Sequence, residues 1–121
     1  MTKLIIAGSQ RFAAGQFRFL TYDLANLARH ALDVEPTAIL TTREPGIGQH
    51  AYSYAKEGPH AIEEHVARTD EEGAAATRSR DRRMATEADA ALVIHQGDCR
   101  GLINACKDMN VPVLSVDIRR L

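Results

Sequence analysis

Uninterrupted aliphatic runs limit how this chain can fold more than any other feature of its sequence. Residues 3–8 and 89–94 form two such runs, and residues 37–41 and 111–116 form two further runs that contain β-branched side chains. An apolar run without alternating polar residues is typical of a strand that is buried on both faces, as at the centre of a parallel sheet. Helices are then needed on both faces to cover the sheet.

The segments between these runs show helical periodicity. Residues 16–32 repeat apolar side chains every three to four positions, which predicts the clearest helix of the chain. Further helices are predicted over residues 47–55, 74–87 and 102–109. A weak pattern at residues 60–67 predicts a short strand at the sheet edge, and the acidic residues 69–73 predict a solvated loop.

This alternation predicts an α/β fold with one doubly wound parallel sheet of about five strands and helices on both faces. The favoured strand order is 3-2-1-4-5, which makes the first and fourth strands neighbours at the topological switch point. With 121 residues, of which 45% are hydrophobic, the chain is expected to form a single domain over residues 1–121. The loops after the first and fourth strands would then lie side by side, where such sheets bind ligands.

Charge and hydropathy restrict the partners of the chain. A net charge of −1 gives no global attraction to nucleic acid or to an anionic membrane, so neither partner is expected. No apolar stretch approaches the ~20 residues of a membrane span, and the first residues lack a secretory pattern, which favours a cytoplasmic location. Cys99 and Cys106 are expected to be reduced thiols.

The first candidate loop is Gly8-Ser9-Gln10-Arg11. Arginine is suited to bidentate contact with a phosphate, and a serine hydroxyl can donate a hydrogen bond to it. We therefore predict that Gly8, Ser9, Gln10 and Arg11 bind the ligand. A tight strand-to-helix turn with a solvated arginine is the structural alternative.

The second candidate loop contains Gly97, Asp98, Cys99, Arg100 and Gly101. A helix is predicted directly after it, so its backbone N–H groups and the positive end of the helix dipole would point into the proposed cleft. Anion binding is favoured here over plain turn geometry.

Three further residues are weaker candidates for the same site. His95 ends the fourth strand, where it could reach the ligand or have a structural role. Glu44 and Gly46 lie in a Pro/Gly loop that could wrap a ligand, with Glu44 accepting hydrogen bonds from ribose hydroxyls. A solvated loop is the alternative at residues 42–48.

Four arginines fall between residues 78 and 83. Helical geometry places them on two sides, so they cannot all face one ligand. Such a run is usually a solvated face or a salt-bridge patch between subunits. Arg80 is the candidate for an inward, ligand-facing position, because Met84 lies on its side of the helix.

The spacing of the histidines and cysteines indicates neither a metal site nor a catalytic nucleophile. His60 and His65 would point to opposite faces of a strand, and the cysteines have no matching cluster, so no metal and no cofactor are expected. No G-x-S-x-G motif is present, and a nucleophilic role for Cys99 would require a lowered pKa.

Four short motifs carry a family resemblance, in the order Ile5-Ile6-Ala7-Gly8-Ser9-x-x-Phe12, Tyr54-Ala55-Lys56-Glu57, Arg80-x-Arg82-x-Met84-Ala85-x-x-Ala88-Asp89-Ala90-x-Leu92-Val93 and Gly97-x-x-Arg100-Gly101. Together they cover nearly the whole chain, which resembles the small DUF2493 (YspA-like) branch of the SLOG superfamily. The resemblance implies a Rossmann-like domain that binds a nucleotide or nucleotide-derived ligand. The superfamily includes the LOG phosphoribohydrolases and the DprA single-strand DNA binders.

The chain also departs from the family pattern. Gln10 stands where the family commonly has arginine, and Asp81 stands where asparagine is usual. In the phosphoribohydrolases the last loop continues with Gly-Thr and glutamates that would assist N-glycosidic cleavage, whereas Gly101 here precedes residues 102–105 with the sequence Leu-Ile-Asn-Ala. Arg80 matches the arginine of the phosphoribohydrolase Arg-Lys-x-x-Met motif.

These departures favour the binding, sensing or sequestering of a small nucleotide-derived ligand without catalysis. One alternative is a nucleoside-monophosphate phosphoribohydrolase in which Glu44 or His95 replaces the missing carboxylates. A third hypothesis is a DprA-like module that binds single-stranded DNA through the arginine run. Apolar helix surface on so small a sheet predicts a homo-oligomer.

Overall fold

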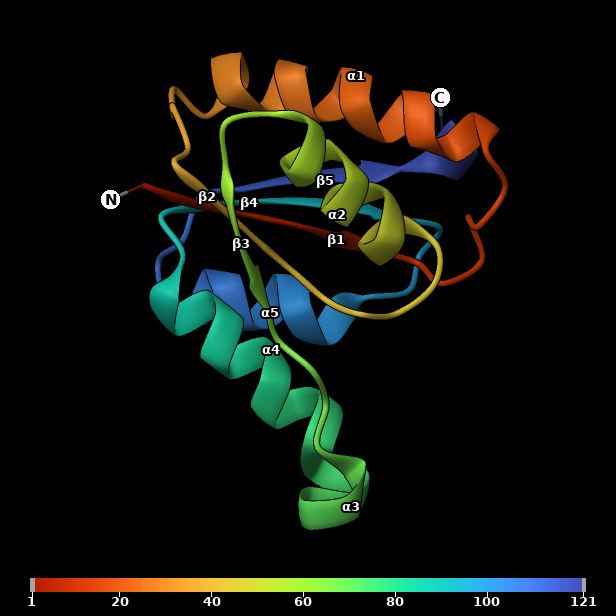
Figure 1. Cartoon of the computed structure of the whole chain (residues 1–121). Helices are drawn as coiled ribbons and strands as arrows, with labels where there is room; N and C mark the ends of the chain where they lie inside the picture. Colours follow the sequence, from red (N-terminus) through yellow and green to blue (C-terminus); the bar gives the residue numbers. More distant parts are fainter. Residues whose placement is uncertain (1, 121) are drawn as a thin grey trace.

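The sheet is parallel throughout and confirms the predicted strand order. The structure is a computed structural model that describes residues 2–120, apart from the side chains at positions 71, 72 and 74. The strands in this range are β1 (Lys3–Gly8), β2 (Ala38–Thr41), β3 (Ala61–Glu64), β4 (Ala90–His95) and β5 (Val113–Asp117). They pair in the order β3-β2-β1-β4-β5 (Figure 1), as in a Rossmann-like α/β fold.

Helices cover both faces of this sheet. The helices of the described residues are α1 (Gln16–Ala31), α2 (Ile47–Glu57), α3 (Thr69–Glu72), α4 (Ala76–Glu87) and α5 (Arg100–Asp108), with 3-10 turns at Gly73–Ala75 and Ile118–Arg120. α1 and α2 lie on one face, and α4 and α5 lie on the other (Figure 1). Across the described residues, no helix has both the length and the apolar character that crossing a bilayer requires.

The side chains of β1 show why both faces must be covered. Leu4 and Ile6 pack into the apolar cluster under α1 and α2, whereas Ile5 and Ala7 pack into the cluster under α4 and α5. All four side chains are buried. The unbroken aliphatic pattern of residues 3–8 therefore follows from a strand that has a core on each side.

β1 and β4 approach each other closely where both strands end. Gly8 pairs with Ile94, and an ideal Cβ on Gly8 would lie 2.0 Å from the carbonyl oxygen of Ile94. No larger residue fits without moving the backbone. The packing of the sheet therefore requires glycine at this position independently of any ligand.

Two predictions for residues 60–73 were wrong in extent or type. The edge strand is limited to Ala61–Glu64, because β2 offers only Ala38–Thr41 for pairing. The acidic residues form the helical turn α3, followed by a 3-10 turn, where a solvated loop was expected. Acidic side chains favour a helix N-terminus, but a single turn has too few residues to show apolar periodicity.

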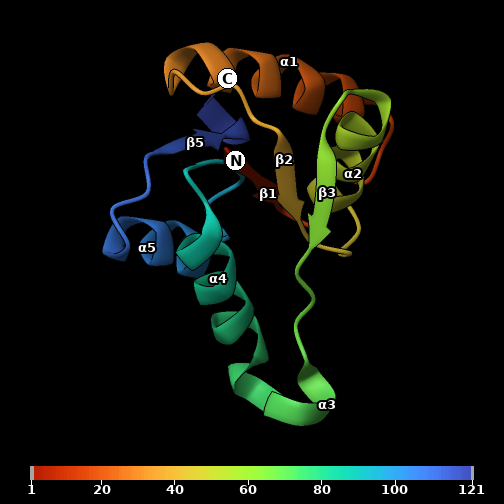
Figure 2. The ribbon, with the colours of Figure 1, turned by 60° about the vertical axis from the view of Figure 1, so that its left-hand side comes forward.

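α3 and the beginning of α4 project from the body of the molecule as an arm (Figure 2). The extended residues 65–68 lead out from β3, and α4 returns to the sheet. Arg83 of α4 donates a hydrogen bond from Nη2 to the carbonyl oxygen of Val66 at 2.8 Å. This bond joins the outgoing segment to the returning helix.

Candidate functional site

A cavity of about 470 Å³ opens at the carboxyl ends of β1 and β4, bounded by the start of α5 and by α4. The ligand residues predicted from sequence that line it are Gly8, Ser9, Gln10, Arg11, Glu44, Arg80, Asp98, Cys99, Arg100 and Gly101. Its volume lies within the range of small-molecule sites. The cavity occupies the switch point at which open α/β sheets bind ligands.

Ser9 joins the two candidate loops. Its backbone N–H donates to the carbonyl oxygen of Ile94 at 3.0 Å, and its hydroxyl hydrogen-bonds the carboxylate of Asp98. The same hydroxyl oxygen accepts the backbone N–H of Arg11 at 3.2 Å. Ser9 is only 1% exposed, so it acts first as a fixed link between the loops.

Asp98 is held as a carboxylate. Partial burial acts to raise its pKa, but hydrogen bonds from the backbone of Gln96 and the hydroxyl of Ser9 outweigh that effect and lower the pKa. The backbone N–H of Gln96 donates to Oδ1 of Asp98 at 3.0 Å. This wall of the cavity therefore carries a fixed negative charge.

The first turn of α5 forms another wall of the cavity. Cys99, the residue before the helix, has a left-handed backbone with φ of 61°, and among the described side chains none caps this helix end. The backbone N–H groups of the first turn lack intrahelical acceptors, so this end attracts an anion. Arg100, Gly101 and Leu102 line the cavity at this point.

The thiol of Cys99 does not provide a nucleophile. Burial, followed by the charges of Asp98, Asp81 and Glu44, raises its pKa to about 12. The thiol is therefore protonated at neutral pH, and Cys99 contributes shape and backbone geometry to the site.

Arg80 points inward from α4 and is 7% exposed. Its guanidinium forms an ion pair with Glu44 and another with Asp81, the latter at 3.1 Å. The side-chain amide of Gln10 donates to the second carboxylate oxygen of Glu44. Glu44 thus bridges the loop after β1 and helix α4, and the Arg80 cation is already matched by protein carboxylates.

The burial of Asp81 is unfavourable for its charged form. Burial raises its pKa, and the neighbouring guanidinium of Arg80 offsets only part of that effect. Its Oδ2 lies so close to α5 that an ideal Cβ on Gly101 would approach it to 3.2 Å. A glycine at position 101 lets α4 and the start of α5 meet across the cavity floor.

Charges of both signs line the cavity in equal number within the described residues. Three guanidinium groups, those of Arg11, Arg80 and Arg100, face three carboxylates, those of Glu44, Asp81 and Asp98. Such a lining suits a ligand that has both an anionic group and hydroxyl or amino groups. It does not suit a polyanion.

Three of the predicted residues lie outside the cavity. Gly46, with φ of 82°, packs behind it, where an ideal Cβ would lie 2.4 Å from the carbonyl oxygen of Ser9. Gly97, with φ of 94°, forms the turn after β4 beside Arg119. Both glycines are explained by backbone geometry.

His95 also has a structural environment. Its Nδ1 accepts the backbone N–H of Gly97 at 2.9 Å, so Nε2 carries the proton and donates to the hydroxyl of Ser115 at 2.7 Å. His95, Ser115 and Asp117 line two hollows beside β5, one of which also reaches Asp98 and Arg100, but His95 does not line the main cavity. His95 is therefore not placed to act on a ligand bound beside Arg80.

Sequence reasoning missed several lining residues, namely Ala7, Thr42, Thr77, Asp81 and Leu102. Thr77 lies three positions before Arg80, and Asp81 lies four positions after Thr77, so the inward position assigned to Arg80 could have identified Thr77 and, through it, Asp81. Thr42 directly follows β2, whose end lies beside β1. The other arginines of the run face elsewhere, since Arg78 and Arg82 line a hollow between α4 and α5.

Comparisons with known proteins add no assignment to this geometry. No family model matches the chain, and no curated protein or solved structure matches it.

Proposed function

We propose that the protein binds a small nucleotide-type ligand in the cavity at the ends of β1 and β4, as a binding, sensing or sequestering protein. One observation carries the proposal: an uncapped helix N-terminus and three guanidinium groups surround a single cavity at the switch point of the sheet. The resemblance to the SLOG superfamily stays a prediction, and it gives the nucleotide class to test first.

The lining suggests how such a ligand would lie. A phosphate fits the first turn of α5, where backbone N–H groups and Arg100 are available. Hydroxyl or amino groups of the ligand would donate to Asp98 or Glu44, which are acceptors when ionised.

Binding is favoured over N-glycosidic hydrolysis by the state of the two candidate catalytic groups. Glu44 is bonded to Arg80 and Gln10, and His95 lies outside the cavity with both ring nitrogens hydrogen-bonded. Neither is free to move a proton at a bound glycosidic bond. We therefore expect no free base from nucleoside monophosphates in a time course at high protein concentration, and steady release of base would favour the hydrolase instead.

Calorimetric titration of the full chain tests binding directly. The panel consists of mono- and dinucleotides, cyclic nucleotides and ADP-ribose, and at least one should show saturable binding. Arg100→Ala should weaken it about tenfold through the loss of a charge-assisted hydrogen bond. Arg80→Ala should weaken it as well, with circular dichroism to verify folding because Arg80 is buried.

Arg82→Ala is the matched control on α4. Arg82 is exposed and lies outside the cavity, so its replacement should leave the affinity unchanged. Absence of binding to every panel member would refute the proposal, and equal weakening by Arg82→Ala would point to a general charge effect.

Glu44→Gln tests whether Glu44 competes with the ligand for Arg80. Removing this carboxylate frees the guanidinium, so the affinity for inorganic phosphate should rise. For a nucleoside monophosphate the gain should be smaller if Glu44 also accepts hydrogen bonds from the sugar. Unchanged phosphate affinity would show that the anion does not reach Arg80.

A further inference from the structure

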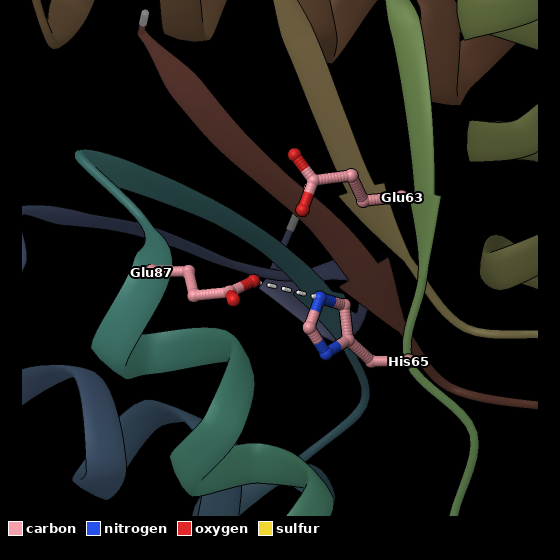
Figure 3. Close-up of side chains that lie close together, drawn as sticks. All are labelled: Glu63, His65 and Glu87. Carbon is pink, nitrogen blue, oxygen red and sulfur yellow. Dashed lines mark ion pairs between the residues drawn. The ribbon is translucent and has the colours of Figure 1, made fainter.

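A second group of ligating side chains lies away from the cavity, between β3 and the end of α4. Glu63 lies in β3, His65 directly follows it, and Glu87 ends α4 (Figure 3). One donor atom from each lies within 4.8 Å of the other two, and Nε2 of His65 is 3.2 Å from Oε2 of Glu87. The group combines an imidazole with two carboxylates.

The backbone holds these residues in place. Glu63 and His65 are two positions apart along an extended segment, so their side chains leave the same face of the sheet. The N–H of His65 donates to the carbonyl oxygen of Thr41 at 2.8 Å, and the next residue, Val66, accepts the hydrogen bond from Arg83. His65 is therefore anchored on both sides before any ion binds.

The separations suit a first-row metal after a small adjustment. Zinc binds imidazole nitrogen and carboxylate oxygen at about 2.0–2.2 Å, which sets neighbouring donors about 3.0–3.5 Å apart. The pair of His65 and Glu87 already has that separation. The Glu63 donor lies at most 4.8 Å from the other two, so it must approach by no more than about 1.5 Å, which is within reach of its side-chain torsions.

The local charge also favours a divalent cation. Glu63, Glu87 and Asp89 gather here around a single ammonium group, that of Lys3, which lies 2.9 Å from Glu63. Three carboxylates therefore face two cations, Lys3 and the Arg83 guanidinium that binds the carbonyl oxygen of Val66, so the balance of charge stays negative.

We propose that Glu63, His65 and Glu87 form a binding site for one divalent transition-metal ion, with Zn²⁺ the best-fitting class. An imidazole ligand selects against Mg²⁺ and Ca²⁺, which take oxygen donors. Three protein donors leave a coordination position for water, and Glu87 is on the exposed side from which an ion can enter. Metal spacing in the sequence did not reveal this site, because Glu87 reaches it from a distant helix.

Titration of the chelator-treated full chain with Co²⁺ and Zn²⁺ tests the site. Co²⁺ should bind at one ion per chain and give visible d–d absorption, without the near-ultraviolet thiolate band that ligation by Cys99 or Cys106 would produce. Zn²⁺ should displace it. Mg²⁺ at the same concentration should not.

His65→Ala should weaken Zn²⁺ binding at least a hundredfold, and Glu87→Gln, on an exposed side chain, should weaken it at least tenfold without disturbing the fold. His30→Ala is the matched control, since His30 is exposed on α1 and far from the group along the chain. Affinity that is the same in all three variants, a thiolate band, or no binding would overturn the proposal. Nucleotide binding is measured separately and does not bear on this result.

Discussion

Single residues in this protein are fixed by close backbone approach as much as by ligand chemistry. Gly8 and Gly97 were candidates for a phosphate loop and Gly46 for a loop that wraps the ligand. A Cβ on Gly8 or Gly46 would overlap backbone atoms, and Gly97 has a φ of 94° that favours glycine. The glycine signal in the sequence is therefore mixed, because a tight turn and an anion cradle require the same residue. Measurements on stability and on binding separate the two roles.

Gly8→Ala should lower the free energy of unfolding by about 3 kcal/mol, since the new methyl group would overlap the carbonyl oxygen of Ile94. Gly15→Ala is the matched control, because an ideal Cβ there meets nothing within 4 Å. Its effect should stay below about 1 kcal/mol. Urea denaturation of both variants gives the comparison, and equal effects would contradict the steric explanation.

Asp81→Asn should raise the free energy of unfolding at pH 7. Burial raises the pKa of Asp81, so the folded protein holds this proton more tightly than the unfolded chain, and stability falls as the pH rises from about 3.9 through the raised value. Asparagine keeps an oxygen acceptor for Arg80 and removes the buried charge.

The gain from Asp81→Asn should shrink as the pH is lowered toward 4, which urea denaturation at several pH values would detect. A variant that is less stable at every pH would show that the ion pair with Arg80 outweighs the burial of Asp81.

At the level of elements, stability should decrease from the centre of the sheet toward its β3 edge. β1 and β4 are flanked by strands on both sides and covered on both faces, whereas β3 is an edge strand with exposed and half-buried residues. Amide hydrogen exchange should be slowest in β1 and β4 and fastest in β3 and α3. Protection in α3 equal to that in β4 would contradict this gradient.

The order of the strands was predictable from sequence, because two unbroken aliphatic runs require central parallel strands and right-handed crossovers leave few arrangements. That strand order also predicts that the loops at residues 8–11 and 97–101 lie side by side. The bond network around Arg80 could not be predicted, since Gln10 and Glu44 reach it from separate loops. Contacts between separate loops leave no periodic pattern in the sequence from which they could be predicted.

The whole molecule is nearly neutral, and its cavity is balanced in charge. Binding of a mononucleotide should therefore depend only weakly on salt, since one or two phosphate contacts release few counterions. Affinity for oligo(dT) should be undetectable at physiological salt, in fluorescence anisotropy titrations. Tight binding with a steep salt dependence would instead support the single-strand DNA hypothesis.

The expected homo-oligomer stays a prediction, which sedimentation equilibrium can test.

The short β3 strand also affects how the molecule behaves at high concentration. A free strand edge invites another chain to add to the sheet and start aggregation. Here the edge offers only Ala61–Glu64 for pairing, follows Pro59 closely, and carries Glu63 and Glu64. A second molecule would find only four residues to pair with, two of which are glutamates held by Lys3 and Arg43, so this edge is a poor template for edge-to-edge polymerisation.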